Sequence, residues 1–176
     1  DKGDQDYADL VQINQNANRA AAPVRQLLAS SRKQTLRPTV INLQDTLSEL
    51  SHLLNRLLTD KVTLRIENGP DLAPVRVDER QLEQVIMNLV VNACDAMPHG
   101  GRIWIEVENA AVSGDGPGTG DGVRLTVRDA GCGMDADTLA RAFEPFFTTK
   151  APGRGTGLGL AMVRQIVDQM GGTIAV

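Results

Sequence analysis

The stretch Asn88-Leu-Val-Val-Asn92-Ala-Cys-Asp95 places two amides and a carboxylate on one face of a predicted helix. The remaining positions of this helix that face a core are apolar: Leu82, Val85, Ile86, Leu89 and Ala93. An unpaired buried amide costs about 1–3 kcal/mol, so the two asparagines need partners. An amide oxygen can coordinate Mg²⁺. Capping or inter-helix hydrogen bonds are the alternative interpretation.

A second motif, Asp129-Ala-Gly131-Cys-Gly133, follows an alternating strand pattern. A carboxylate at the end of a strand can accept hydrogens from the amino group of adenine. The two glycines let the backbone approach the base closely. An ordinary turn built on Asp and Gly is the alternative interpretation.

Two more motifs follow in order. Phe143-Glu-Pro-Phe-Phe147 contains all three phenylalanines of the chain and predicts an apolar anchor for a mobile loop, with core packing as the alternative. The run Gly153-Arg-Gly155-Thr-Gly157-Leu-Gly159 precedes a helix that begins near Gly157. The N–H groups at a helix start attract anions. Lys150 and Arg154 would supply positive charge for the β and γ phosphates of a nucleotide.

The remaining periodicities predict an α/β sandwich, one mixed sheet with helices on a single face. Leucines at helical spacing predict a helix over 43–57, and Asp78 is a suitable N-cap for a helix that runs to about Met97. Strand patterns cover 39–43, 62–66, 74–77, 102–108 and 123–128. We expect a solvated glycine-rich loop at 113–122 and the first strand of a hairpin at 172–176.

The N-terminal part of the chain has the apolar pattern of an amphipathic helix. Apolar residues recur every 3.5 positions between 10 and 27, which is the seam of a helix packed lengthwise against partner helices. Pro23 interrupts the seam and predicts a kink near 19–23. The polar stretch 30–38 ends on a proline and predicts a helix end and linker. Both ends of the chain suggest a piece of a longer protein.

Composition excludes several classes of protein. A net charge of -4 and a pI near 5.2 argue against a nucleic-acid-binding protein, which needs a basic surface. Cys94 and Cys132 lack CxxC spacing, so we interpret them as reduced thiols. No apolar run reaches the ~18 residues that span a bilayer, and no signal peptide is recognisable. We therefore expect a soluble cytoplasmic piece, whose parent protein can still be anchored to the inner membrane.

In this order and at these spacings, the four motifs resemble the ATP-binding domain of the GHKL superfamily, specifically the sensor histidine kinases. Residues 88–95 match the N box, 129–133 the G1 box, 143–147 the F box and 155–159 the G2 box. The resemblance covers about residues 39–176. Residues 24–38 resemble the second dimerisation helix and linker of CckA-type hybrid kinases. The resemblance to these kinases implies two parts. Residues 1–36 would be the second dimerisation helix and its linker, and residues 37–176 a Bergerat-type ATP-binding domain that lacks its C-terminal strand.

The resemblance also implies a site for ATP and Mg²⁺. Asn92 would hold the metal, Asn88 would support it, and Asp129 would recognise adenine. Catalysis would involve Asn88, Asn92 and Lys150. The residues implied to contact the nucleotide are Asn92, Asp95, Asp129, Gly131, Gly133, Phe147, Lys150, Arg154, Gly155, Thr156, Gly157, Leu158 and Gly159.

The implied reaction is in-line transfer of the γ-phosphoryl group of ATP to a histidine, catalysed mainly by positioning and charge neutralisation. The acceptor would lie on an upstream dimerisation helix, and relay would continue to an aspartate of a receiver domain. His52 and His99 fit a surface helix position and a turn instead. The implied partners are a second copy in the full-length protein, a response-regulator receiver domain and a histidine phosphotransfer protein, but no nucleic acid.

Two alternatives remain at this point. Hydrolysing GHKL ATPases place a water-activating glutamate where this chain has Asn88, which disfavours efficient hydrolysis. A degenerate kinase that serves as a docking scaffold is the other alternative.

Overall fold

The computed structural model describes residues 36–112, 120–151 and 155–176, and Arg37–Val176 form one compact unit. The predicted seam helix, its kink at Pro23, most of the predicted linker, and Arg154 lie outside the described residues. Among the helices that are described, none combines the length and apolar character needed to cross a membrane.

Two long helices form where the apolar periodicity predicts them. Helix α2 spans Leu43–Leu57, and the side chain of its N-cap Asn42 accepts a hydrogen bond from the N–H of Gln44 at 3.0 Å. Helix α3 spans Glu79–Ala96, and its predicted N-cap Asp78 accepts from the N–H of Gln81 at 3.3 Å. A capped start satisfies backbone donors that have no partner within the helix.

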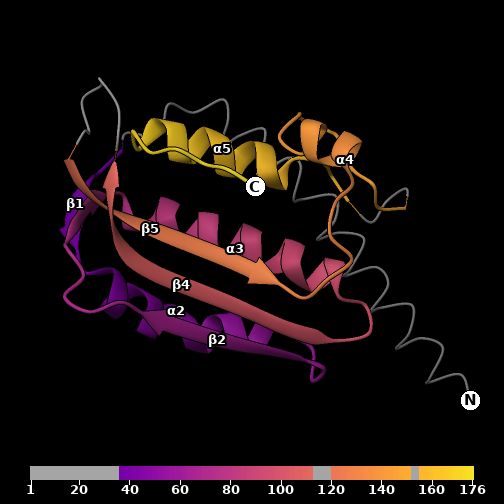
Figure 1. Ribbon diagram of the computed structural model, residues 1–176, viewed down its shortest axis with the longest axis horizontal. Helices are drawn as coiled ribbons and strands as arrows, with labels where there is room; N and C mark the ends of the chain where they lie inside the picture. Colours follow the sequence, from indigo (N-terminus) through magenta and orange to yellow (C-terminus); the bar gives the residue numbers. More distant parts are fainter. Residues whose placement is uncertain (1–35, 113–119, 152–154) are drawn as a thin grey trace, which may run out of the picture. The chain divides into compact units, whose positions relative to one another are not determined.

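The strands form two small sheets (Figure 1). Strand β2 (Val62–Asn68) pairs in parallel with β4 (Gly101–Val112), which pairs antiparallel with β5 (Gly120–Asp129). Strand β1 (Thr39–Ile41) pairs antiparallel with β3 (Val75–Val77). The main sheet is therefore mixed, as predicted, but β1 and β3 form a separate small sheet where the sequence predicted a single one.

Helices α2 and α3 lie on the same face of the main sheet (Figure 1). Alternation along β4 turns Ile103, Ile105 and Val107 into the core with exposed fractions of at most 2%. Trp104 faces the other way and lies under the guanidinium of Arg128. Helix α5 (Gly159–Gln169) packs on α3 through a second cluster, whose buried members are Val85, Val163 and Ile166.

Three expectations need correction. A short helix, α4 (Ala136–Arg141), was not expected, because six residues are too few to show an apolar period. Both hairpin strands run further than their alternation indicates, so the glycine-rich connection is shorter than 113–122. Residues 172–176 form no strand. After α5 the chain turns through Gly171, at φ +74, and the N–H of Gly172 donates a hydrogen bond to the carbonyl of Val167 at 3.0 Å.

Candidate functional site

Helix α3 presents three polar side chains, those of Asn88, Asn92 and Asp95. Asn88 and Asn92 are half-buried and Asp95 is exposed near the end of the helix. The amide of Asn88 points to α5, where its Nδ2 lies 3.8 Å from the sulfur of Met162. Of the predicted core residues of α3, Leu82, Val85, Ile86 and Ala93 are buried, Leu89 is half-buried, and Val90 is an additional buried residue.

The motif at the end of β5 lies against the last turn of α3. The Oδ1 atom of Asp129 accepts a hydrogen bond from the N–H of Gly131 at 2.8 Å. The N–H of Cys132 donates to the carbonyl of Ala96 at 3.1 Å. A Cβ at Gly131 would lie 2.7 Å from that of Ala96, so only glycine allows this approach. The sequence-predicted adenine site and the polar face of α3 therefore meet at one end of the sheet.

The start of α5 lies beside Asn92. A Cβ at Gly159 would lie 3.4 Å from the Nδ2 atom of Asn92. Among the described residues, no side chain caps the start of helix α5 after Leu158, and N–H groups at such a helix start attract anions. Thr156 accepts a hydrogen bond from the N–H of Leu158 at 3.4 Å, which holds the approach to the helix.

Lys150 completes this cluster. Its ammonium lies 2.5 Å from Oδ2 of Asp95 and 3.5 Å from Oδ1 of Asn92. These contacts bring a cation from the segment after the phenylalanine motif to the end of α3. Gly155 packs against the same segment, since a Cβ there would approach Thr148 and Lys150.

The phenylalanine motif does not form one packed cluster. Phe146 is 72% exposed, while Phe143 and Phe147 are half-buried. The guanidinium of Arg141 lies over Phe147 at 4.2 Å, and that of Arg164 lies over Phe143 at 5.1 Å. The prediction that all three rings pack in the core is therefore wrong.

Gly133, in the motif at the end of β5, adopts φ +68, and a Cβ added there meets no described atom within 4 Å. Its backbone conformation, not a lack of space, therefore requires glycine.

Both cysteines are free thiols. Cys94 is half-buried on α3, and burial, followed by the charge of Asp95, raises the pKa of its thiol. Cys132 is exposed in the turn beside Asp129. Neither histidine fits a reactive position, since exposed His52 lies on α2 and exposed His99 lies in the turn before β4.

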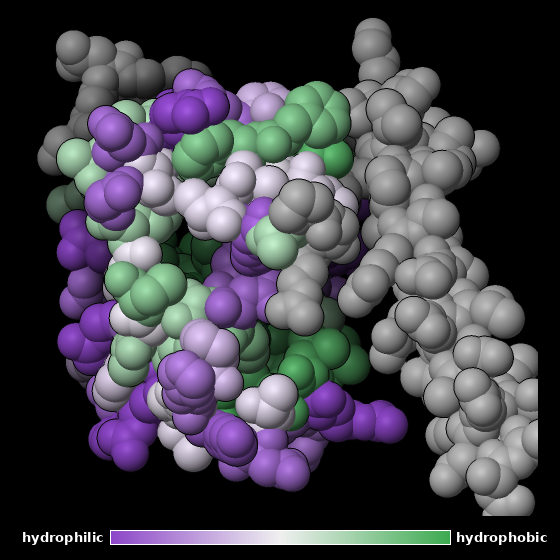
Figure 2. All heavy atoms as spheres, turned by 90° about the vertical axis from the view of Figure 1, so that its right-hand side faces the viewer, coloured by the Kyte–Doolittle hydropathy of each residue, from purple (hydrophilic) through white to green (hydrophobic). Residues whose placement is uncertain are grey.

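Figure 2 faces the side of the molecule where α3 and β5 end. The surface there is hollowed, with hydrophobic side chains at the floor and hydrophilic ones along part of the rim. This combination of an apolar floor and a few polar groups is typical of small-molecule sites.

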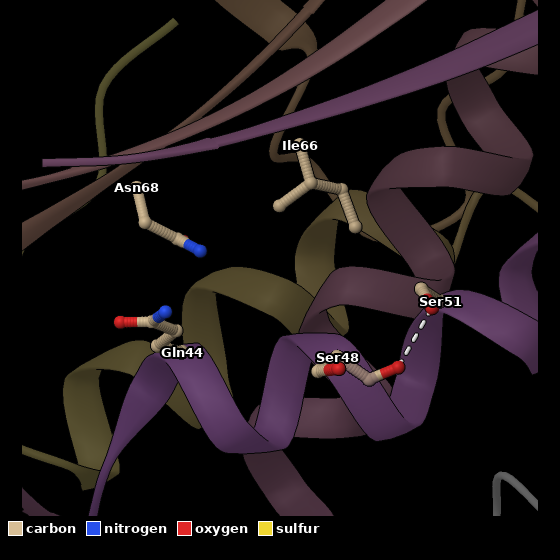
Figure 3. Close-up of a pocket in the computed structure, with 5 residues that line it drawn as sticks. All are labelled: Gln44, Ser48, Ser51, Ile66 and Asn68. Carbon is tan, nitrogen blue, oxygen red and sulfur yellow. Dashed lines mark hydrogen bonds between the residues drawn. The ribbon is translucent and has the colours of Figure 1, made fainter.

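Two grooves lie elsewhere on the surface, and their linings suit a nucleotide less well. One of about 260 Å³ lies between α2 and the edge strand β2 and is lined by Gln44, Ser48, Ser51, Ile66 and Asn68 (Figure 3). Another, of about 390 Å³, lies at Ala73, Asn109, Ala110, Ala111 and Gly122. These linings hold amides, hydroxyls and small residues, with no charged group to meet a phosphate. The end of α3 is therefore the candidate functional site.

Reading the sequence missed two contacts of this site: Met162 against Asn88, and Lys150 against Asp95. One signal for the second was present. Asp95 puts a carboxylate at the end of α3, and the last turn of that helix has no basic residue. The negative end of a helix favours a nearby cation.

Comparison with known proteins supports one family. The model of the histidine kinase-, DNA gyrase B- and HSP90-like ATPases matches residues 77–176. The sensor kinase CckA of Brucella abortus (strain 2308) is 51% identical over 97% of this chain, which spans 19% of that protein's length.

Solved histidine kinases share the fold. The nucleotide-free catalytic domain of histidine kinase ThkA is 28% identical, with a TM-score of 0.62 over 76% of this chain and 82% of that one. ThkA in complex with the response regulator protein TrrA superposes with a TM-score of 0.70 at 25% identity, over 91% of this chain and 43% of that one.

Proposed function

Because the chain belongs to the family of histidine kinase-, DNA gyrase B- and HSP90-like ATPases, we propose that it is the ATP-binding catalytic part of a two-component sensor histidine kinase. It transfers the γ-phosphoryl group of ATP to a histidine of a dimerisation helix, for relay to a receiver-domain aspartate. Residues 37–176 are the catalytic domain in this proposal. Residues 1–36 are the second dimerisation helix and its linker.

One observation supports this function above the others. Asn92, Asp95, Lys150 and the uncapped start of α5 converge at one end of α3, beside the turn that holds Asp129. Amide and carboxylate oxygens, an ammonium and free helix N–H groups together suit a phosphate chain with its metal. In this proposal Asp129 recognises the base, and the packing of Gly131 against α3 supports that role.

The oxygens at this site fit a cation. Oδ1 of Asn92 and Oδ2 of Asp95 already share one, the ammonium of Lys150. No group of three His, Cys, Asp or Glu side chains suited to a metal occurs among the described residues. Mg²⁺ usually binds through one or two protein oxygens together with phosphates and water, so a pair is sufficient. When bound, Mg²⁺ neutralises charge on the transferred phosphoryl group.

The environment of Asn88 favours phosphoryl transfer over hydrolysis. An amide cannot take a proton from water, and this one faces the sulfur of Met162 on α5. Positioning of the phosphate chain by Lys150, Asn92 and the start of α5 then supplies the main catalytic effect. The proposed partners are a second copy, a receiver domain and a histidine phosphotransfer protein. The complex of the related kinase ThkA with the response regulator protein TrrA supports the receiver domain as a partner.

The test mixes this chain with γ-labelled ATP, Mg²⁺ and a separately produced dimerisation domain of a CckA-type kinase that carries its histidine. We expect acid-labile, alkali-stable label on the added domain, and loss of the label with Asn92→Ala. A histidine-to-alanine variant of the added domain is the control. Release of free phosphate without protein label would instead identify a hydrolase.

A further inference from the structure

Asn92 and Asp95 share a cation that the chain itself supplies. Lys150 reaches them from a segment 55 residues beyond Asp95. Its side chain is 32% exposed and that of Asp95 is 46% exposed, so water reaches the pair but does not surround it. The backbone N–H of Lys150 donates a hydrogen bond to Oγ1 of Thr148 at 3.2 Å, which holds the backbone from which the ammonium extends.

Electrostatics explains why the lysine lies there. The end of α3 combines the negative pole of the helix with the carboxylate of Asp95, and its last turn contains no basic residue. A cation from another segment therefore stabilises this end. The same two oxygens are those that the proposed function assigns to Mg²⁺. Two cations in contact with one carboxylate oxygen repel each other.

We propose that Lys150 is a built-in counter-cation that holds Asn92 and Asp95 in the nucleotide-free protein and competes with the divalent cation for them. The competition rests on the proposed function, whereas the contact of Lys150 with Asp95 does not. Asp95 is accordingly a positioning residue. Its carboxylate holds the lysine in place until a metal-bound nucleotide displaces the ammonium, which is then free to meet phosphate.

This role differs measurably from that of a simple phosphate-binding lysine. Removal of a phosphate ligand weakens nucleotide binding equally with and without Mg²⁺. Removal of a competitor weakens binding of the metal-free nucleotide but increases the benefit of adding Mg²⁺. The ratio of the two dissociation constants therefore separates the roles.

The first measurement tests the contact without nucleotide. The 176-residue chain is treated briefly with an acetylating reagent, and acetylation of each lysine is followed by mass spectrometry. We expect Lys150 to react about threefold more slowly than exposed Lys61, as for a partly exposed ion pair. Asp95→Asn should remove that protection, whereas Asp168→Asn, at an exposed position of α5, should not. Equal rates for Lys150 in wild type and Asp95→Asn would overturn the proposal.

The second measurement tests the competition by calorimetry with ADP, in Mg²⁺ and in EDTA. For Lys150→Met we expect the ratio of the dissociation constant in EDTA to that in Mg²⁺ to rise about threefold. Lys150→Arg, which keeps the charge, should stay near the wild-type ratio. An unchanged ratio for Lys150→Met would contradict the competition. A wild-type chain that binds ADP in neither buffer would overturn the proposed function and with it the competition, while acetylation would still decide the contact.

Discussion

The N–H of Phe146 donates a 2.8 Å hydrogen bond to the carbonyl of Gly157, and both residues have left-handed backbones, at φ +69 and φ +64. This bond closes the segment that carries Lys150 onto the start of α5. A Cβ at Gly157 would lie 2.3 Å from the carbonyl carbon of Phe146, a backbone atom that cannot rotate away. Glycine is therefore required at 157 by conformation and by space together.

Gly157→Ala should open this segment and weaken nucleotide binding. The left-handed conformation alone costs a residue with a side chain about 1–2 kcal/mol, and the contact with Phe146 adds to that cost. We expect ADP affinity, measured by calorimetry, to fall by at least about tenfold.

Gly171→Ala is the matched control for this change. Gly171 has φ +74, but an added Cβ meets no atom within 4 Å, and the residue lies beyond α5. It should show only the conformational cost, as a lower unfolding free energy with unchanged ADP affinity. Equal ADP affinities for wild type and Gly157→Ala would contradict the role of the Phe146–Gly157 bond.

The packing of α3 on the sheet sets the stability of the domain. Ile86 of α3 is fully buried in the cluster that α3 forms with α2 and the sheet. Ile86→Ala should lower the free energy of unfolding in urea by about 3 kcal/mol, through lost burial and the cavity left behind. Val40→Ala, at a position 68% exposed, should change it by less than about 0.5 kcal/mol. Similar losses for the two variants would show that α3 is not packed as described.

The sequence predicted the elements that combine a strong period with a clear cap. Helix α3 has both, since Asp78 caps it and its apolar residues recur on one face, and its bounds match the prediction closely. The mixed sheet with helices on one face, and the resemblance to histidine kinase ATP-binding domains, are confirmed by the family match and by solved kinase domains. The roles assigned to single residues of the site remain predictions.

What the sequence could not predict depends on distant contacts or on very short elements. The pairing of Lys150 with Asp95 depends on where a loop places an ammonium, which no periodicity records. Phe146 is 72% exposed and has a left-handed backbone, whereas an apolar side chain suggests burial, and the sequence pattern records neither fact. Helix α4 has a capping signal, Asp135 with Thr138, but no apolar stripe to mark it as a helix.

The two thiols should differ in reactivity towards iodoacetamide. Burial and the neighbouring Asp95 raise the pKa of Cys94, so at a given pH less of it is the reactive thiolate. Cys132 is exposed, and we expect it to be alkylated first at pH 8, as read by mass spectrometry. Asp95→Asn should speed the reaction of Cys94 by removing a negative charge. In concentrated urea the two rates should become equal; faster alkylation of Cys94 in the folded protein would refute this prediction.

Asp129→Asn should change which base the site accepts. The amide oxygen of asparagine can still accept the N–H of Gly131, so the turn at the end of β5 is retained. The amide nitrogen, however, is a donor and opposes the donor amino group of adenine. Loss of a hydrogen bond to a charged group costs about 1.5–3 kcal/mol, which corresponds to about 10- to 100-fold in affinity.

Inosine diphosphate tests the same contact with donor and acceptor exchanged. Its base carries an acceptor oxygen, O6, where adenine carries a donor amino group, and the amide nitrogen of asparagine can donate to that oxygen. We therefore expect calorimetry to show that wild type prefers ADP and that Asp129→Asn moves the preference towards inosine diphosphate. Asp168→Asn removes an equal charge from an exposed position of α5 and should leave the preference unchanged. If both variants lose the same affinity for both nucleotides, Asp129 acts through overall charge and does not recognise the base.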